Sequence, residues 1–412
     1  MFFPPPPAAG ADFGAIGGRV FSLNISGEAA ASLAGYVNGG ADENALGDIF
    51  SWKLNFSAGT SAVKGVVNLN LTPAAQPVAI DEAYMGLSFG RADIEAGLRK
   101  LTWGRADSFG PLDVINPTDY SDMTRMGDGL RDGGILKIPR PLVRASYRIG
   151  SSAAIEGVFV PNFEPDRFAQ TGRWVPADES ASLPVDVPDT AALDYAQWGV
   201  RFTASLAGAT DIGVQYFHGR LARAAVLTVY PPLSLTPSHI TRAYNSYHQI
   251  GVDWAGILFG CNLRAEAAAN ITEDRMGSDG GVYNPFLAWS FGFDRDVFWG
   301  INIKAQCSET IRLLDERTND YALFDIEADR DVTETLVIAA VSKKFFHDEL
   351  EAGVTVLWGL EGKDFLLIPS VVWTKGAVRA ELSGGIFGGA RDGQFGQYGD
   401  NSFIKAAMKY TF

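Results

Sequence analysis

The chain ends with NSFIKAAMKYTF, residues 401–412, in which apolar and polar side chains alternate. Successive side chains of a β-strand point to opposite faces, so Tyr410 and Phe412 share an apolar face while Lys405 and Lys409 lie on the other face. A half-buried strand of a soluble protein has the same pattern. The segment therefore decides the fold only if the rest of the chain repeats it.

The alternation recurs along the whole chain. In IFSWKLNFSA, residues 49–58, Trp52 and Phe56 share one face, whereas Lys53 and Asn55 share the other. About 18 such strands are predicted, a number typical of large outer-membrane barrels. They cover residues 19–37, 49–59, 61–72, 80–89, 93–103, 141–149, 152–161, 194–207, 210–224, 243–255, 257–271, 283–294, 296–311, 332–346, 349–361, 364–374, 377–388 and 401–412.

The connections between these strands alternate in length. Tight turns are predicted at 57–61, 89–93, 149–153, 206–210, 253–257, 293–297, 345–349 and 373–377, and long loops fill most of the other connections. The connections 73–79 and 361–364 are exceptions, because they stand at positions of long loops but are shorter than the other long loops. Short periplasmic turns and long extracellular loops distinguish outer-membrane barrels, whereas a soluble sandwich has no reason to sort its loops. The sequence thus predicts an all-β protein, a transmembrane antiparallel β-barrel.

Aromatic residues gather beside the tight turns and at the carboxyl end, as in the aromatic girdle at a membrane interface. These residues are Phe89, Trp254, Phe293, Phe345, Trp373, Tyr410 and Phe412. In lipid a sheet must close on itself, so the last strand is expected to pair with the first. The terminal aromatic pattern resembles the signal read by the barrel-assembly machinery of Gram-negative-type bacteria. We therefore expect an outer-membrane location, with lipid and lipopolysaccharide around the barrel.

Composition excludes other classes of protein. The net charge of −14 argues against a nucleic-acid partner, which needs a basic surface. No uncharged apolar run reaches the roughly 18 to 20 residues of a membrane helix. Cys261 and Cys307 fall in apolar strand patterns, and we expect no disulfide between them. Residues 1–18 lack a secretory signal and are predicted to be an extended segment ahead of a barrel formed by residues 19–412.

If the apolar faces meet lipid, the opposite faces line the lumen. We count 11 basic and six acidic side chains there and expect the lumen to favour anions. A salt-bridged wall without selectivity is the alternative. The candidate pore-lining residues are Arg99, Arg144, Arg148, Arg201, Arg264, Arg379, Glu82, Glu95, Glu266 and Glu381, and the count also includes Lys53, Lys64, Lys304, Lys405, Lys409, Glu156 and Glu351.

One connection, residues 104–140, is too long and too rich in Gly, Pro and charge to be a strand. Loops of this length are usually functional or disordered. Its aromatic and turn residues favour an ordered loop that folds inward and narrows the pore, with an exposed flap as the alternative. Trp103, Gly104, Asn116, Pro117 and Asp119 are the candidate pore-loop residues.

Metal binding and catalysis have weak support. Asp325, Glu327, Asp329 and Asp331 alternate within an acidic stretch and are weak candidates for a Ca²⁺ site, although such a run is more often a solvated loop. The four histidines show no spacing that predicts a catalytic triad. We predict no cofactor, no metal and no catalytic residue.

Residues 80–168 carry a series of motifs: EAY at 82–84, GLRKLTWG at 97–104, INPTD at 115–119, IP at 138–139 and PNFEP at 161–165. Their order resembles an uncharacterised family of bacterial outer-membrane proteins. The resemblance implies a large barrel similar to alginate-export and substrate-specific porin channels, which moves small or hydrophobic organic compounds across the outer membrane. It implies no catalytic residue.

We therefore predict a passive outer-membrane channel for small solutes, in particular anionic or carboxylated organic compounds. The barrel is expected to be monomeric or trimeric. A transporter of hydrophobic compounds or lipids and a surface adhesin or structural barrel are the alternatives. A plugged, energy-linked transporter is disfavoured, because only about 18 residues precede the first strand and a plug domain needs many more.

Overall fold

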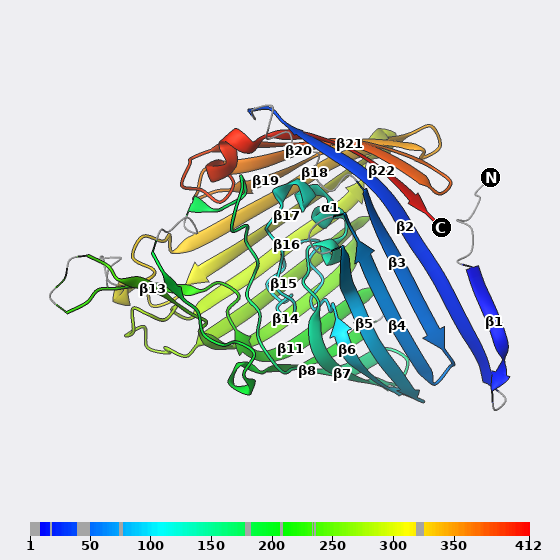
Figure 1. The fold of residues 1–412 in the computed structure, drawn as a ribbon, viewed down its shortest axis with the longest axis horizontal. Helices are drawn as coiled ribbons and strands as arrows, with labels where there is room; N and C mark the ends of the chain where they lie inside the picture. Colours follow the sequence, from blue (N-terminus) through cyan, green and yellow to red (C-terminus); the bar gives the residue numbers. More distant parts are fainter. Residues whose placement is uncertain are drawn as a thin grey trace.

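The computed structural model describes residues 9–16, 19–38, 50–73, 77–177, 183–206, 209–232, 234, 236–318 and 325–412. Nineteen of the described strands form one antiparallel sheet that curves into a barrel (Figure 1). The first strand, β1, pairs with β2 alone among the described strands, so the closed wall has 18 strands. The predicted fold is confirmed.

Each predicted strand has a counterpart in the wall. The observed strands are β2 (Arg19–Tyr36), β3 (Phe50–Gly59), β4 (Val63–Leu71), β5 (Val78–Phe89), β6 (Ala92–Arg99), β7 (Arg140–Ile149), β8 (Ala153–Val160), β10 (Gln197–Leu206), β11 (Thr210–Arg220), β14 (Ser246–Leu258), β15 (Cys261–Thr272), β16 (Phe286–Asp296), β17 (Ile301–Arg312), β18 (Thr333–Phe345), β19 (Leu350–Gly359), β20 (Asp364–Lys375), β21 (Val378–Gly389) and β22 (Phe403–Thr411).

Smaller elements lie in the connections. β9 (Val185–Asp186), β12 (Ala225–Val229) and β13 (His239–Ala243) form a separate three-stranded sheet. The helix α1 (Met126–Arg131) lies in the connection between β6 and β7. Single 3₁₀ turns span Met123–Arg125, Gly133–Ile135, Leu193–Tyr195, Phe298–Gly300, Asp315–Arg317 and Gly396–Asn401. No helix in the described ranges is both long enough and apolar enough to cross a membrane.

The first and last wall strands close the barrel. β22 pairs with β2 from Glu28↔Thr411 to Tyr36↔Phe403, and the main chains of Gly27 and Phe412 exchange two hydrogen bonds of 2.9 and 3.0 Å. β1 (Ala9–Ile16) pairs with the preceding part of the same β2 edge and extends beyond the wall (Figure 1). It belongs to the stretch predicted as an extended segment, of which residues 1–8 and 17–18 lie outside the described residues.

The connections sort onto two rims, which we call the tight-turn rim and the long-loop rim. The tight-turn rim carries the eight connections from β3–β4 to β20–β21 and the end of β22. Two predicted turns are displaced: β14 runs to Leu258 and β16 to Asp296, so the turns occupy 259–260 and 297–300. In both strands the alternation stops before the strand does, because residues 254–258 are apolar or glycine and residues 294–296 are all charged. Polarity therefore does not mark where these strands end. Gly260, with φ of 74°, marks the first of these turns.

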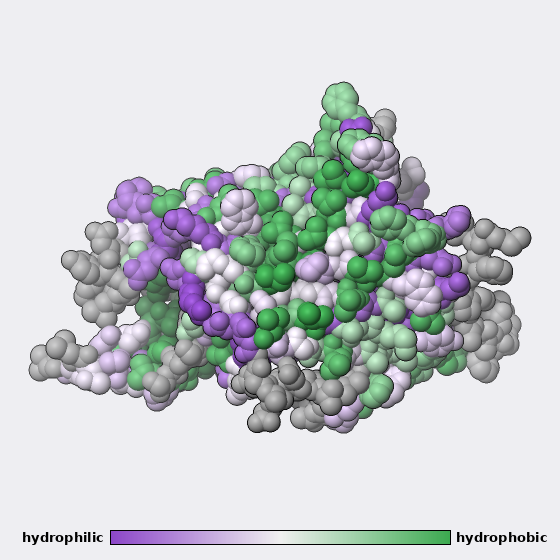
Figure 2. All heavy atoms as spheres, turned by 90° about the horizontal axis from the view of Figure 1, so that it is seen from above, coloured by the Kyte–Doolittle hydropathy of each residue, from purple (hydrophilic) through white to green (hydrophobic). Residues whose placement is uncertain are grey.

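The outer face of the wall is apolar. Side chains such as Phe50, Met85, Ile250 and Met408 are more than half exposed on this face. Figure 2 shows apolar residues across the middle of one side of the barrel and hydrophilic residues toward both margins. Aromatic residues occur near both rims: Phe89, Phe345, Trp373, Tyr410 and Phe412 near the tight turns, and Phe50, Trp52, Trp198, Trp358 and Phe365 near the long loops. The second group was missed in the sequence, because the strand starts after long loops are not marked by tight turns.

Candidate functional site: the barrel lumen and its inward segment

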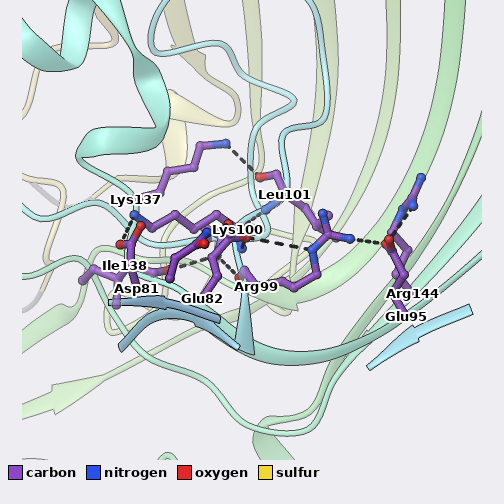
Figure 3. A network of polar contacts seen from close by, with 11 residues as sticks. Asp81, Glu82, Glu95, Arg99, Lys100, Leu101, Lys137, Ile138 and Arg144 are labelled. Carbon is purple, nitrogen blue, oxygen red and sulfur yellow. Dashed lines mark hydrogen bonds and ion pairs between the residues drawn. The ribbon is translucent and has the colours of Figure 1, made fainter. Parts of the chain in front are cut away.

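Charged side chains of neighbouring strands form an ion-pair network inside the barrel (Figure 3). Arg99 contacts Glu95 on β6 and lies 3.9 Å from Glu82 on β5. Arg144 on β7 lies opposite Glu95, at 2.9 Å, and its Nε donates to Glu156 on β8 at 2.6 Å. The predicted pore-lining residues of β5 to β8 therefore meet in one place. Each arginine neutralises at least one carboxylate, so this part of the wall has little free charge.

The connection between β6 and β7, residues 100–139, lies within the barrel (Figure 1). We call it the inward segment. Asn116 joins its two ends: its Oδ1 accepts from the N–H of Leu101 at 2.7 Å, and its Nδ2 donates to the carbonyls of Arg99 and Ile138 at 3.0 and 2.8 Å. The carbonyl of Pro117 also accepts from the N–H of Ile138 at 2.8 Å. Asn116 is 6% exposed, so these bonds form where water cannot replace them.

Trp103 and Gly104 begin the path of the segment across the lumen. Trp103 is buried against the ring of Phe217, and its indole N–H donates to Glu156 at 2.7 Å. Gly104 has φ of 91°, a conformation that side chains disfavour. A Cβ atom there would lie 2.4 Å from Oε1 of Glu266. A glycine is needed at this position for both reasons.

Glu266 on β15 holds the middle of the segment. Its carboxylate accepts from the N–H groups of Arg105, Ala106 and Leu112, with distances of 2.6 Å to Ala106 and 3.4 Å to Leu112. The side chain of Glu266 is buried, so its negative charge is balanced by these donors rather than by water. Glu266 was expected to line the pore, and the structure shows that it binds the main chain of the inward segment.

A second set of contacts fixes Arg105 and its neighbours to the same wall. Arg105 lies 3.0 Å from Asp253 on β14 and 3.2 Å from Asp211 on β11. Asp253 also pairs with Arg201 at 2.5 Å, and its side chain has no exposed surface. Arg264 pairs with Asp107 at 2.6 Å. Arg201 and Arg264, both predicted pore-lining residues, thus help to hold the segment.

Three wall glutamines complete this attachment, although none of them was among the candidate pore-lining residues. Gln215 donates to the carbonyl of Leu112 at 3.0 Å, and Gln249 donates to the carbonyl of Pro111 at 3.0 Å. Gln306 accepts from the N–H of Asp107 at 3.0 Å. The three glutamines are buried and their side chains lie on the lumen face of their strands. The sequence signal that could have identified them is an amide side chain on the polar, lumen-facing side of a strand.

The opposite end of the segment contacts the other side of the barrel. Lys405 on β22 lies 2.8 Å from Asp128 of α1, and Arg131 lies 2.7 Å from Glu381 on β21. Although burial alone would raise the pKa of Asp128, the charge of Lys405, with Lys409 and Arg131 behind it, holds that pKa well below its usual range. Met123 and Met126 pack into an apolar cluster with wall residues that include Leu366, Ile368, Phe387 and Phe403.

Asp119 links the inward segment to the loop after β8. Its Oδ1 accepts from the N–H of Ser121 at 3.0 Å, and its Oδ2 lies 3.6 Å from Arg167. The N–H of Tyr120 donates to the carbonyl of Arg167 at 2.7 Å. All five candidate pore-loop residues therefore make or permit contacts that shape the segment.

Two predicted pore-lining arginines lie apart from this assembly. Arg148 is 58% exposed near the tight-turn rim, where it donates to the carbonyl of Gly90 at 2.7 Å. Arg379 lies 3.3 Å from Glu381, and more than a third of its side chain is exposed. Both face the lumen according to the strand register. They have fewer protein partners than Arg144 and Arg201.

The strand register also changes the charge of the lumen wall. Eight further acidic side chains and three further basic ones share the lumen face, which removes the predicted surplus of five positive charges. Several of these residues lie at strand ends, where the sequence pattern does not show which face a side chain takes. The additional acids are Glu28, Asp93, Asp211, Asp253, Asp294, Asp296, Glu334 and Asp364, and the additional bases are Arg140, Arg312 and Lys344.

The acidic stretch does not form the alternating strand on which a shared face depends. Residues 326–330 form turns, so Asp325 and Glu327 are buried while Asp329 and Asp331 are exposed. Asp325 accepts from the N–H of Glu327 at 2.9 Å, and Glu327 accepts from the N–H of Asn284 at 2.9 Å. Within the described residues no group of three or more His, Cys, Asp or Glu side chains is arranged to hold a metal ion.

An 18-stranded antiparallel barrel with a loop folded into its lumen is the architecture of porin-type barrels. The chain belongs to the DUF1302 family, described as a protein of unknown function, whose sequence pattern matches residues 43–273. No curated protein sequence matches the chain.

Solved structures share the fold at low sequence identity. Pseudomonas aeruginosa OccK9 (OpdG) is 9% identical, with a TM-score of 0.52, over 95% of this chain and 97% of that chain. Pseudomonas aeruginosa OccK5 (OpdH) is 8% identical, with a TM-score of 0.51, over the same shares. The outer membrane channel DcaP of Acinetobacter baumannii is 12% identical, with a TM-score of 0.46, over 98% of this chain and 100% of that chain. At these identities the likeness to OccK9 and OccK5 shows the fold alone.

Proposed function

We propose that the protein is a porin-like channel of the outer membrane, through which small solutes diffuse passively past the inward segment. The apolar outer face supports a place in lipid, because charged side chains there would cost roughly 2 to 4 kcal/mol each near the midplane. The pairing of β2 with β22 shows that the carboxyl-terminal segment is a strand of the wall. We propose that the barrel-assembly machinery recognises the protein through this strand. The observation that carries the proposal is that Glu266 and Lys405, on different parts of the wall, both hold the inward segment.

The inward segment is the part of the channel that we propose as the constriction. Its contacts with β8, β11, β14, β15 and β17 fix one part, and its contacts with β21 and β22 fix another. Solutes would therefore pass between these attachments. No enzymatic step is proposed, because the charged groups that the structure brings together are ion-paired arginines and carboxylates rather than a nucleophile with a base.

For the solutes, we propose small organic compounds that carry a carboxylate. The net charge of the wall no longer supports this class, because acids and bases balance. The distribution of exposed charge does support it: Arg148 and Lys304 are more than half exposed, and Arg379 more than a third, all toward the tight-turn rim. These cations would attract carboxylates that have passed the inward segment.

A second candidate function is transport of hydrophobic compounds. It is favoured by the apolar cluster on the lumen face of β20 to β22, where Leu366, Ile368, Phe387 and Phe403 meet α1. Displacement of α1 would expose this surface to the lumen. We also propose that the barrel contacts lipopolysaccharide and forms a homo-oligomer.

Planar-bilayer conductance tests the channel directly. We expect stepwise open-channel currents from the purified protein, and larger steps when residues 104–136 are replaced by a short Gly-Ser linker. A barrel that inserts but shows no current steps in either form would refute the proposal. Liposome swelling with sugars and carboxylates, compared with uptake of a fatty acid, distinguishes the two solute classes.

A further inference from the structure

A pocket of about 300 Å³ lies at the long-loop rim, between the ends of β16 to β18 and the loops that follow β8, β11, β15 and β17. Its apolar lining comes from Leu221, Tyr283, Phe286 and Val332. Tyr283 is buried and its hydroxyl donates to the carbonyl of Ala224 at 2.9 Å, so the ring is held in place. A pocket of this size accommodates a small organic molecule with an apolar body.

The basic side chains that line the pocket already have partners. Arg312 is 8% exposed, with its guanidinium bound to the carbonyl of Glu327 at 2.9 Å and to Asp315 at 2.5 Å. Arg330 pairs with Glu334, and its guanidinium lies 5.3 Å from the centre of the Tyr283 ring. These contacts leave Arg312 and Arg330 little capacity to bind an anion. The third lining arginine, Arg223, is 59% exposed and lies 3.9 Å from Glu334.

Asp166, in contrast, lines the pocket without a cationic partner in the described part of the chain. One carboxylate oxygen accepts from the N–H of Thr118 at 2.7 Å. Burial raises the pKa of Asp166 to about 6, and the Thr118 hydrogen bond offsets only part of that shift. Asp331, an exposed acid at the same pocket, also lacks an ion pair among the described contacts. Asp166 is half-buried, and a partly desolvated carboxylate without a counter-charge is a group that an incoming cation stabilises.

We propose that this pocket binds small organic ammonium compounds that carry an apolar or aromatic body, with Asp166 as the counter-charge and Phe286 and Tyr283 as the apolar wall. Aromatic rings beside a carboxylate suit such a ligand, because an ammonium group is attracted to ring faces as well as to the acid. The inference rests on the proposed channel and narrows its solutes to those with an amine, including amino-carboxylates.

The pocket is connected to the inward segment through Asp166 itself. Thr118, whose N–H binds Asp166, belongs to that segment, and Arg167 beside it pairs with Asp119. A ligand at Asp166 therefore lies one hydrogen bond from the proposed constriction. This position makes the pocket an entry site at the mouth of the lumen.

Binding is tested by isothermal titration calorimetry on the detergent-solubilised barrel with three probes that share a phenyl ring: phenethylamine, 3-phenylpropionate and phenylalanine. We expect phenethylamine and phenylalanine to bind and 3-phenylpropionate not to bind. Asp166→Asn should weaken phenethylamine at least tenfold, while the control Asp189→Asn, on the same loop but outside the pocket lining, should leave it unchanged. Equal binding of the amine and the acid, or an unchanged Asp166→Asn variant, would overturn the inference.

A second variant keeps the test decisive if Asp166→Asn folds poorly. Phe286→Ala should weaken phenethylamine but leave the weaker binding of ethylamine unchanged, since only the aromatic contact is lost. Unchanged binding of phenethylamine to Phe286→Ala would overturn the assignment of the pocket. The channel proposal is tested separately. Current steps without amine binding would refute only the proposed ligand of the pocket, whereas amine binding to a barrel that never conducts would refute only the proposed channel.

Discussion

Replacement of Glu266 by Gln should loosen the inward segment measurably. Glu266 accepts three main-chain hydrogen bonds from the segment, and an amide can accept at only one of the two oxygen positions. The best orientation keeps the carbonyl oxygen toward Arg105 and Ala106 and turns the NH₂ group toward the N–H of Leu112. The variant therefore loses one hydrogen bond and the charge assistance of two others.

The size of the effect follows from these contacts. A hydrogen bond to a charged group contributes about 1.5 to 3 kcal/mol and a neutral one about 0.5 to 1.5 kcal/mol, while the uncharged side chain recovers some desolvation cost. We therefore expect the opening free energy of residues 105–112 to fall by about 2 kcal/mol. Opening would then be roughly 30-fold more frequent, because 1.36 kcal/mol corresponds to a factor of ten.

Hydrogen–deuterium exchange followed by mass spectrometry measures this change. Peptides that cover residues 101–116 should exchange faster by that factor in the detergent-solubilised Glu266→Gln barrel, while peptides from β19 to β21 keep their wild-type rates. Glu351→Gln is the matched control, since Glu351 also faces the lumen but makes no contact with the segment in the described structure. Unchanged exchange at residues 101–116 would show that Glu266 does not hold the segment, and the proposed constriction would lose its main anchor.

Three further predictions test other parts of the lumen. Charge reversal of Arg144 and Arg148 to Glu should shift the reversal potential toward cation selectivity, and an unchanged potential would mean that neither side chain lines the ion path. Lys405→Met removes the cation that lowers the pKa of Asp128. In the wild type the Asp128–Lys405 ion pair persists as the pH falls toward about 4, because it is lost only when the pH reaches the lowered pKa. The current noise of the wild type should therefore stay constant at acid pH, while that of the variant should increase. Phenethylamine needs ionised Asp166, whose pKa is about 6, so its affinity should fall roughly tenfold between pH 7.5 and pH 5 and the dependence should vanish in Asp166→Asn. Titratable and charged groups around Asp166 that also need control variants are Tyr120, Arg223, Arg312, Glu327, Arg330, Asp331 and Glu334.

The wall of the barrel could be predicted from the sequence because its signal is local. Alternation along IFSWKLNFSA fixes which face of β3 meets lipid without knowledge of any other strand, and β3 begins within one residue of the predicted start. Strand ends were less accurate where the alternation stops before the strand does, as in the apolar stretch that ends at Leu258. Local polarity therefore gives strands and faces, but the ends depend on backbone geometry such as the positive φ of Gly260.

The contents of the lumen could be predicted only in part. The motif residues Trp103, Gly104 and Asn116 lie in the inward segment, and their residue types suit turns and buried contacts. Their partners were not found, because Gln215 and Gln306 are ordinary polar residues on distant strands. The predicted charge balance of the lumen was wrong for a related reason, because it depends on residues such as Asp253. The sequence predicted a tight turn at Asp253, whereas this residue lies inside β14 and pairs with Arg105 of the segment.

The attachment of the inward segment constrains the order in which the barrel assembles. Arg105 and its acceptor Glu266 are 161 positions apart in the sequence, and Lys405 and Thr124 are 281 positions apart. When β6 and β7 first pair, none of these partners is in place, and each such distant contact carries a loop-closure cost before it contributes stability. The last of these partners belong to β21 and β22, the strands that complete the wall beside β2. Closure of the seam and completion of the contacts of the inward segment therefore depend on the same carboxyl-terminal hairpin.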